Sequence, residues 1–393
     1  MHFNLIEIFL VILFLALFVT VIFRHLHIPI ILGYVLVGII VGPNVLAWLP
    51  NAQVIKDIAE FGVVLMMFTV GLEFSFPKLM TLRRSVFVLG TLQVFFSSMI
   101  SAIIGVSLGM PLIPSIIIGS IVSMSSTAIV VKQLLYQREI NTSHGKNAIG
   151  ILLFQDLAVI PILILIPSLS LNNHQFILLL LLWSAVKGLT AMLIIFGIGQ
   201  YLLKPFIKLI AGTQVIELFT LAVLFISVGT AWFTNYLGLS YALGAFLAGM
   251  LLAECEFKEQ ITAEIRPFRD VLLGLFFISI GMLVNISLWT NAWGWIVLLL
   301  VGLTIGKGFL ITMLSLIFKD DLETATRTGL VLAEGGEFGF AILTIALFHH
   351  LLPVEWGQAV LALLFISFMI APILVRYNKK VSGYLFAKSM PKK

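Results

Sequence analysis

Asp156 lies near the middle of a long apolar run, GILLFQDLAVIPILILIP, and is the only charged residue in it. A carboxylate at bilayer depth costs about 2.5–3.5 kcal/mol on insertion scales, so a membrane segment that carries one generally uses its charge. Gln155 is its neighbour, and three hydroxyl side chains precede the pair, namely Ser125, Ser126 and Thr127. One negative charge and several neutral oxygens predict a site that holds either a cation or a proton.

A carboxylate alternates between the two ligands when its pKa lies near the working pH, which burial and nearby charges adjust. Neutral oxygens around a single carboxylate suit a weakly held monovalent ion such as K+ or Na+, since a divalent ion requires more carboxylates. We therefore expect Asp156 to bind the ion or proton, with Gln155, Ser125, Ser126 and Thr127 as neutral ligands.

Other charged residues also lie within apolar segments. Lys307 lies in GLTIGKGFLI, and a lysine at this depth needs a partner or water, for which Asp156 is the natural candidate. We expect this ion pair to break when the cation binds. Glu334 and Glu337 belong to a second polar interruption, AEGGEFGF, where they would line the pathway to the site or pair with Lys307.

The composition places these residues in a membrane protein. The chain has 393 residues, of which 61% are hydrophobic and only 10% charged, with a mean hydropathy of +1.15. A soluble domain carries about 25% charged residues. Long continuous apolar runs predict helices, since a barrel would show alternation with a period of two. Cys255 is the only cysteine, which excludes disulfide frameworks and cysteine metal sites.

Hydropathy predicts thirteen membrane-spanning helices connected mostly by short loops. The predicted spans are about 4–23, 28–42, 54–74, 86–109, 113–136, 146–168, 176–203, 215–237, 239–255, 268–286, 292–318, 324–349 and 356–377. With this count, 20 of the 23 basic residues fall on one side of the membrane. The positive-inside rule then predicts an outside N-terminus and a cytoplasmic C-terminus.

An internal repeat appears at an offset of about 210 residues. LGYVLVG at 32–38 matches LGAFLAG at 243–249, and FTVG at 68–71 matches ISIG at 278–281. We expect repeat one at about 1–168, a linker helix at about 176–203, an inverted repeat two at about 215–378, and a tail at 379–393. The repeat pairs two interrupted helices, at SMSSTA and at AEGGEFGF, whereas the equivalent of Asp156 falls near Ser367. Because the carboxylate is not duplicated, we expect one cation site per chain.

These segments together resemble the monovalent cation:proton antiporter-2 family, specifically its Kef-type potassium/proton antiporters, over about residues 5–377. The matching segments are GLE at 71–73, SSTA at 125–128, FQD at 154–156, LSYALGAFLAG at 239–249, FFISIGM at 276–282 and AEGGEFG at 333–339. The resemblance implies a homodimer in a bacterial inner membrane, crossed broken helices in a sodium/proton-antiporter-like fold, and elevator-like alternating access. It also implies Asp156 as the ion carrier and Lys307 as the basic residue of the core.

Kef-type systems usually continue into a cytoplasmic nucleotide-binding domain that glutathione or its adducts regulate. No Gly-x-Gly-x-x-Gly follows a strand here, so we expect no cofactor in this chain. The predicted loop from Glu254 to Asp270 resembles the regulatory contact loop of the family. Its acidic residues are Glu254, Glu256, Glu259 and Glu264.

Three other functions compete with an antiporter. A potassium channel would need a filter such as TVGYG, which the sequence lacks. A sodium-coupled symporter of organic anions would need anion-binding groups where the broken helices meet. An intramembrane aspartyl protease would need two facing aspartates, and only Asp156 lies mid-span, so we expect no enzyme.

Overall fold

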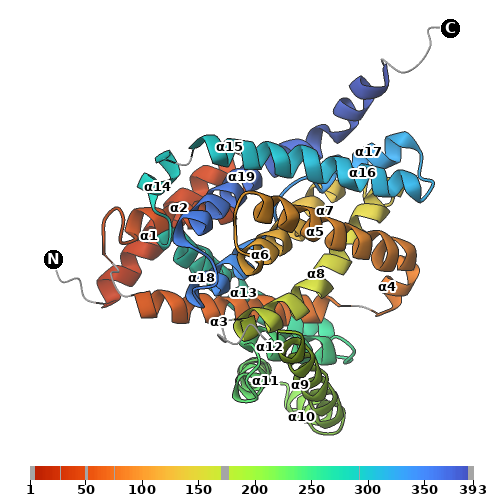
Figure 1. The fold of residues 1–393 in the computed structure, drawn as a ribbon. Helices are drawn as coiled ribbons and strands as arrows, with labels where there is room; N and C mark the ends of the chain where they lie inside the picture. The colour runs from red at the N-terminus through yellow and green to blue at the C-terminus, as the bar shows by residue number, and fades with distance from the viewer. Residues whose placement is uncertain are drawn as a thin grey trace. The chain divides into compact units, whose positions relative to one another are not determined.

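The structure, a computed structural model, describes residues 5–26, 28–48, 52–74, 76–169, 177–291 and 293–387. All regular elements in these ranges are helices, which confirms the all-α prediction (Figure 1). Within the described residues, seven helices are long and apolar enough to cross a membrane, and four shorter apolar helices accompany them. The count of thirteen spans stays a prediction.

The chain forms two compact units, and each takes segments from both predicted repeats. The first unit comprises Met1–Leu17, Tyr34–Phe76 and Ile160–Leu283, and the second comprises Phe18–Gly33, Pro77–Val159 and Val284–Lys393. At the offset of about 210 residues, 77–159 corresponds to roughly 287–369, which lies in the same unit. Equivalent segments of the two repeats therefore fold together.

The first unit contains most of α2 (Ile30–Val41), the start of α1 (Leu5–His25) and the end of α8 (Ser143–Leu169). Its other helices are α3 (Ala52–Glu73), α9 (Ile177–Ile198), a π-helical turn (Gly199–Leu203), α10 (Lys204–Ala211), α11 (Ile216–Tyr236), α12 (Tyr241–Leu252) and α13 (Lys258–Met282).

Four glycines bring helices of this unit into close contact. A Cβ atom at Gly38 would lie 2.8 Å from the Cα atom of Gly281, and one at Gly71 would lie 3.0 Å from the Cα atom of Gly249. Only glycine permits such an approach. Gly38 and Gly249 are equivalent in the predicted repeat, as are Gly71 and Gly281, so α2 packs on α13 as α12 packs on α3. These two contacts pair the glycines that the predicted repeat makes equivalent, and the repeat boundaries and the inversion stay predictions.

The second unit contains most of α8 and the two interrupted helices. Its other elements are α4 (Phe76–Thr81), a π-helical segment (Arg84–Gly90), α5 (Thr91–Ser107), α6 (Leu112–Ser123), α7 (Thr127–Tyr136), α14 (Ile286–Asn291), α15 (Trp293–Val301), a second π-helical segment (Gly302–Lys307), α16 (Gly308–Ile317), α17 (Leu322–Val331), α18 (Glu337–Phe348) and α19 (Val354–Ala387). The π-helical segments directly precede α5 and α16, and at the offset of about 210 residues α5 corresponds to about 301–317, the second π-helical segment together with α16.

The two predicted interruptions are both present. Between α6 and α7 the backbone is extended at Met124 and Ser126, and the Ser126 hydroxyl caps α7 by accepting from the Ile129 N–H. Between α17 and α18 the chain leaves the helix after Val331 and re-enters it at Glu337. Each interruption leaves half-helix ends with unsatisfied backbone groups and partial charges in the middle of an apolar segment.

The two interruptions touch each other. The Ser125 hydroxyl donates a 3.0 Å hydrogen bond to the Leu332 carbonyl oxygen. A Cβ atom at Gly336 would lie 2.6 Å from the Ser125 carbonyl oxygen, so a glycine is required there. We call this place, formed by residues 123–127 and 332–337, the crossing. An apolar cluster that includes Val130, Leu152 and Val375 packs α7, α8 and α19 together beside it.

Candidate functional site

Asp156 lies beside the start of α7. The Thr127 hydroxyl donates to its Oδ1 atom over 3.1 Å. Asp156 and Thr127 are both half-buried, whereas Ser125 and Ser126 are buried. The fold therefore brings Thr127 to Asp156, and Ser125 to Gln155, from segments about 30 residues apart.

Gln155 is buried and its amide bonds in two directions. Its Oε1 atom accepts a 2.7 Å hydrogen bond from the Ser125 N–H. Its Nε2 atom donates to Gln93 Oε1 over 2.8 Å and lies 3.4 Å from Ser125 Oγ. In this conformation, the amide oxygen of Gln155 is occupied by a hydrogen bond from the backbone of the crossing. Gln93 on α5 is fully buried, and it was missed because the sequence shows it only as one amide within an apolar span.

Lys307 is 4% exposed, and its ammonium group lies at the crossing. Nζ donates to the carbonyl oxygens of Met124, over 2.6 Å, and of Glu334, over 2.8 Å. These carbonyls follow the C-terminal ends of α6 and α17, where the helix dipoles favour a positive charge. The ammonium group thus stabilises both interruptions at once. Its pairing with Asp156 stays a prediction.

Glu334 is fully buried at the crossing. Its Oε1 atom accepts a 2.7 Å hydrogen bond from the Ser126 N–H, at the N-terminal end of α7. Its Oε2 atom is buried and has no hydrogen-bond partner among the described residues. Glu337 reaches the same helix end, where its Oε1 atom lies 3.4 Å from the Ala128 N–H. Both carboxylates therefore face the positive end of the α7 dipole.

The second interruption has its own cap on α19. The Gly335 N–H donates to the Ser367 hydroxyl over 2.8 Å, as the Ser125 N–H donates to Gln155 in the first interruption. Ser367 is 1% exposed and lies where the repeat predicted the equivalent of Asp156. The second repeat thus keeps the hydrogen bond but supplies a hydroxyl in place of the amide.

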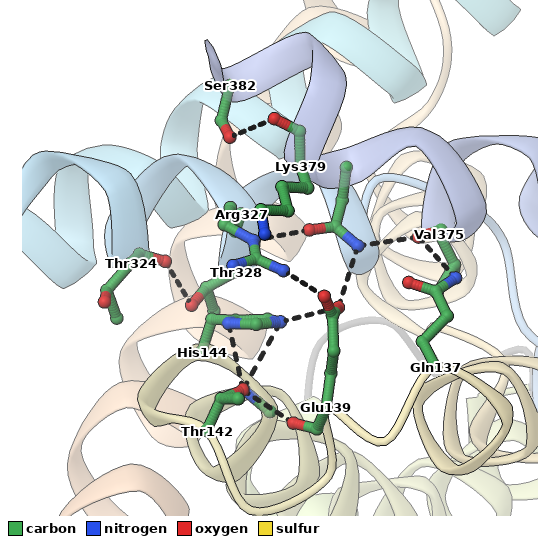
Figure 2. A network of polar contacts seen from close by, with 12 residues as sticks. Gln137, Glu139, Thr142, His144, Thr324, Arg327, Thr328, Val375, Lys379 and Ser382 are labelled. Carbon is green, nitrogen blue, oxygen red and sulfur yellow. Dashed lines mark hydrogen bonds and ion pairs between the residues drawn. The ribbon is translucent and has the colours of Figure 1, made fainter. Parts of the chain in front are cut away.

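A second polar cluster lies beyond the end of α7 and beside the middle of α17, and we call it the clamp (Figure 2). Arg327 of α17 bonds to Glu139 Oε1 over 2.5 Å and to Asn378 Oδ1 of α19 over 2.6 Å. Glu139 Oε2 accepts from Asn378 over 3.3 Å and lies 3.2 Å from His144 Nε2. The clamp joins the turn after α7 and the start of α8 to α17 and α19. It was not foreseen from the sequence.

Glu139 of the clamp has a pKa below its ordinary value. Burial alone raises the pKa of this carboxyl group, but hydrogen bonds from Arg327 and Asn378 and the charge of Arg327 outweigh the burial. Glu139 is therefore ionised at neutral pH and forms a buried, charge-assisted pair with Arg327.

The acidic residues predicted to form a regulatory loop belong to the first unit. Glu254 and Glu256 are exposed in the turn between α12 and α13, and Glu259 is exposed in the first turn of α13. Glu264 is half-buried and accepts a 3.1 Å hydrogen bond from the Thr220 hydroxyl, while Glu254 lies 3.5 Å from the Lys204 ammonium. The crossing is built wholly from the second unit.

The arrangement at the crossing has a defined chemistry. Among the described residues, no group of three or more His, Cys, Asp or Glu side chains is arranged to hold a metal ion. One half-buried aspartate with a hydroxyl neighbour, next to a buried lysine and a buried glutamate, is suited to an exchangeable monovalent cation or proton. Interrupted helices that meet around such charges define a secondary ion transporter.

Comparisons with known proteins agree with this class. Residues 10–377 match the family described as sodium/hydrogen exchanger, transmembrane, so the chain belongs to that family, whose members are transporters and not enzymes. The chain is therefore a multi-pass membrane protein.

Two related sequences show which kind of antiporter this chain resembles. The chain is 41% identical over 339 residues to a predicted K(+) efflux antiporter, KefB, of Alkalimonas amylolytica, covering 85% of this chain and 50% of that protein. It is 36% identical over 349 residues to the chloroplastic K(+) efflux antiporter 1 of Arabidopsis thaliana, covering 87% and 29%. The Kef-type resemblance is thereby confirmed. The chain spans half of the first relative and less than a third of the second.

Solved structures confirm the fold. The sodium proton antiporter MjNhaP1 of Methanocaldococcus jannaschii at pH 8 matches with a TM-score of 0.64 at 16% identity, covering 95% of this chain and 97% of that one. A second structure of the same antiporter matches with a TM-score of 0.65 at 17% identity. At this identity the likeness concerns the fold alone.

Proposed function

We propose that this chain exchanges a monovalent cation, preferably K+, for a proton across the membrane. Asp156 carries either the cation or the proton, never both, and the Thr127 hydroxyl is its neutral neighbour. The observation that supports this best is the hydrogen bond between these two side chains where an interrupted helix resumes. The preference for K+ follows from the relatives, both of which are described as K(+) efflux antiporters.

The other charges at the crossing support a one-for-one exchange. Lys307 and Glu334 are both buried and carry opposite charges, so this pair adds no net charge to the site. Glu337 also lies at the crossing, and in the proposed cycle it keeps its charge while Asp156 exchanges a cation for a proton. A single carrier that binds K+ or H+ moves no net charge over a complete cycle, so the exchange is electroneutral.

The remaining features of the proposal come from the resemblance and, for the orientation of the termini, from the distribution of basic residues. Alternating access occurs by an elevator-type movement of the unit that holds the crossing. The protein forms homodimers in a bacterial inner membrane, with the N-terminus outside and the C-terminus in the cytoplasm. The turn before α13 and the first turns of α13, which carry Glu254, Glu256, Glu259 and Glu264, contact a regulatory domain.

The test is proton exchange in proteoliposomes, followed with a pH-sensitive dye after addition of K+, Na+, Li+ or choline. Wild type should respond to K+. Asp156→Asn should exchange at least about 100-fold more slowly, because an amide neither takes up a proton nor offers a negative charge to a cation. Asp321→Asn is the matched control, since this exposed aspartate only caps α17 through the Thr324 N–H and asparagine caps equally well. Wild-type exchange by Asp156→Asn would overturn the proposal.

A voltage clamp with a potassium ionophore tests electroneutrality. Equal rates with and without the clamp are expected, whereas a faster clamped rate would mean that net charge moves. Sodium-dependent uptake of an organic acid without proton exchange would instead identify a symporter, and single-channel currents would identify a channel.

A further inference from the structure

A relay of three hydrogen bonds encloses the first interruption. The Ser125 N–H donates to Gln155 Oε1 over 2.7 Å, and Gln155 Nε2 donates to Gln93 Oε1 over 2.8 Å. Gln93 Nε2 then donates to the Ser123 carbonyl oxygen over 3.0 Å. The relay thus leaves the backbone at residue 125 and returns to it at residue 123. Gln93 is fully buried, and Gln155 is 1% exposed.

Backbone groups at its two ends fix the direction of this relay. The Ser125 N–H only donates, so the Gln155 atom that faces it must be the amide oxygen. The Ser123 carbonyl only accepts, so the Gln93 atom that faces it must be the amide nitrogen. The two remaining amide atoms then meet as donor and acceptor. No other pair of uncharged side chains of this length satisfies both ends without a donor facing a donor.

Between the two ends of the relay lies Met124. Its carbonyl oxygen accepts the 2.6 Å hydrogen bond from Lys307, and Thr127, the neighbour of Asp156, follows three residues later. The relay therefore holds the backbone of 123–125 in the shape that directs one carbonyl at the lysine. Any change in that shape also moves the hydroxyl groups that border Asp156.

Gln93 and Lys307 lie about one helical turn apart in the repeat, because at the offset of about 210 residues Lys307 corresponds to Ser97. Each lies in the span before an interrupted helix and just after a π-helical segment or at its end. Gln93 donates to a carbonyl 30 residues later, at the end of α6, and Lys307 donates to one 27 residues later, beyond the end of α17. Corresponding spans thus carry a neutral donor in one repeat and a charged donor in the other, on neighbouring turns.

We propose that Gln93 is a positioning residue for the cation site, which fixes the Gln155 amide and the backbone at 123–125 and thereby sets the discrimination between K+ and Na+. The proposal rests on the proposed function, because it assumes that Asp156 binds the cation. In it, Gln155 acts through the backbone and through Gln93 and is not itself the deciding ligand. Gln93 touches no ion.

The test compares Gln93→Met with Ser97→Ala in proteoliposomes. Methionine keeps the length and volume of the side chain but removes both hydrogen bonds of the relay. Ser97→Ala removes the other contact of the same amide, at 3.1 Å, and leaves the relay intact. For Gln93→Met we expect the KM for K+ to rise about tenfold, with the maximal rate within about twofold, and the ratio of K+ to Na+ affinity to fall at least about threefold. Ser97→Ala should behave as wild type.

A merely structural role would lower the amount of folded protein and leave KM and the ion ratio unchanged. Gln93→Asn provides a second variant, because it stays polar but is one methylene too short to reach Gln155 and Ser123 together. Unchanged KM and ion ratio in either folded variant would overturn the proposal, and so would a failure of both variants to fold.

The Asp156→Asn variant separates this inference from the proposed function. If Asp156→Asn kept wild-type exchange, the proposed function itself would fail. If Asp156→Asn were inactive while the Gln93 variants matched wild type, only this inference would fail.

Discussion

The crossing and the clamp are both buried polar clusters of the second unit, and they satisfy their polar atoms differently. In the clamp, both oxygens of Glu139 accept hydrogen bonds, and Arg327 donates to Glu139, to Asn378 and, over 3.5 Å, to Glu323. At the crossing, one oxygen of the buried Glu334 has no hydrogen bond among the described residues, and Lys307 donates to backbone carbonyls.

The difference separates a cluster that fixes structure from one that is able to change partners. Buried polar groups are expensive unless they are paired, so a saturated network has little to gain from rearrangement. A network with an unpaired polar atom is stabilised when it binds a cation, a proton or another partner. The two clusters lie at opposite ends of α7, which has 10 residues and is about 15 Å long. The clamp holds the turn after α7 and the middle of α17, while the start of α7 and the end of α17 border the crossing.

The largest effect that tests this comparison is on stability, at the clamp. Arg327→Met leaves the Glu139 carboxylate buried without its main partner, and the side chains of the two residues are only 10% and 17% exposed. Breaking such a pair should lower the free energy of unfolding by about 3 kcal/mol. Denaturant titration in detergent micelles measures this change. Transport per folded molecule should stay within about threefold of wild type, because the crossing keeps all its groups.

Glu323→Gln is the control for that measurement. Glu323 also approaches Arg327, but its side chain is 59% exposed, so its replacement should change stability by less than about 0.5 kcal/mol. If Arg327→Met abolished exchange without loss of stability, the clamp would belong to the transport site and the comparison would fail.

The opposite pattern is expected at the crossing for Glu334→Gln. The amide still accepts from the Ser126 N–H, and Lys307 keeps its hydrogen bonds to the carbonyl oxygens of Met124 and Glu334, so the free energy of unfolding should fall by less than for Arg327→Met. Lys307 then lacks its buried counter-charge, and its field disfavours a cation at Asp156. We expect the KM for K+ to rise about tenfold, which corresponds to about 1.4 kcal/mol.

Transport kinetics and thermal unfolding should be measured on the same preparation of this variant. Unchanged KM together with a lower unfolding temperature would assign Glu334 to structure and remove the contrast with the clamp.

The smallest expected effect is the dependence of clamp stability on pH. Because the pKa of Glu139 is lower in the folded protein than its ordinary value, its pairing contributes stability above that ordinary value, about 4.5, and the contribution is lost as pH falls through the lowered pKa. Glu139→Gln should therefore be less stable than wild type at pH 7, and the difference should shrink towards about zero at the most acid pH that the protein tolerates. Thermal unfolding of both proteins across this range measures it. A difference that is independent of pH would mean that ionisation of Glu139 does not stabilise the clamp.

The sequence alone predicted the class of the protein and the two interruptions, and it singled out Asp156 as the candidate carrier. A charge in an apolar run is costly wherever the run folds, so Asp156 and Lys307 stood out without any knowledge of neighbours. The repeat was also readable, because close helix packing requires glycine and leaves Gly38, Gly71, Gly249 and Gly281 at matching positions.

Only the tertiary structure decided which polar groups meet. Gln93, Ser367 and the clamp were missed because their partners lie 30 to 239 residues away and a single amide, hydroxyl or turn residue carries no periodic signal. The bonds of Lys307 to carbonyl oxygens were equally unreadable, since they depend on where two helices stop being helical. Sequence sets the cost of burying each group, and helix packing alone determines which partner offsets it.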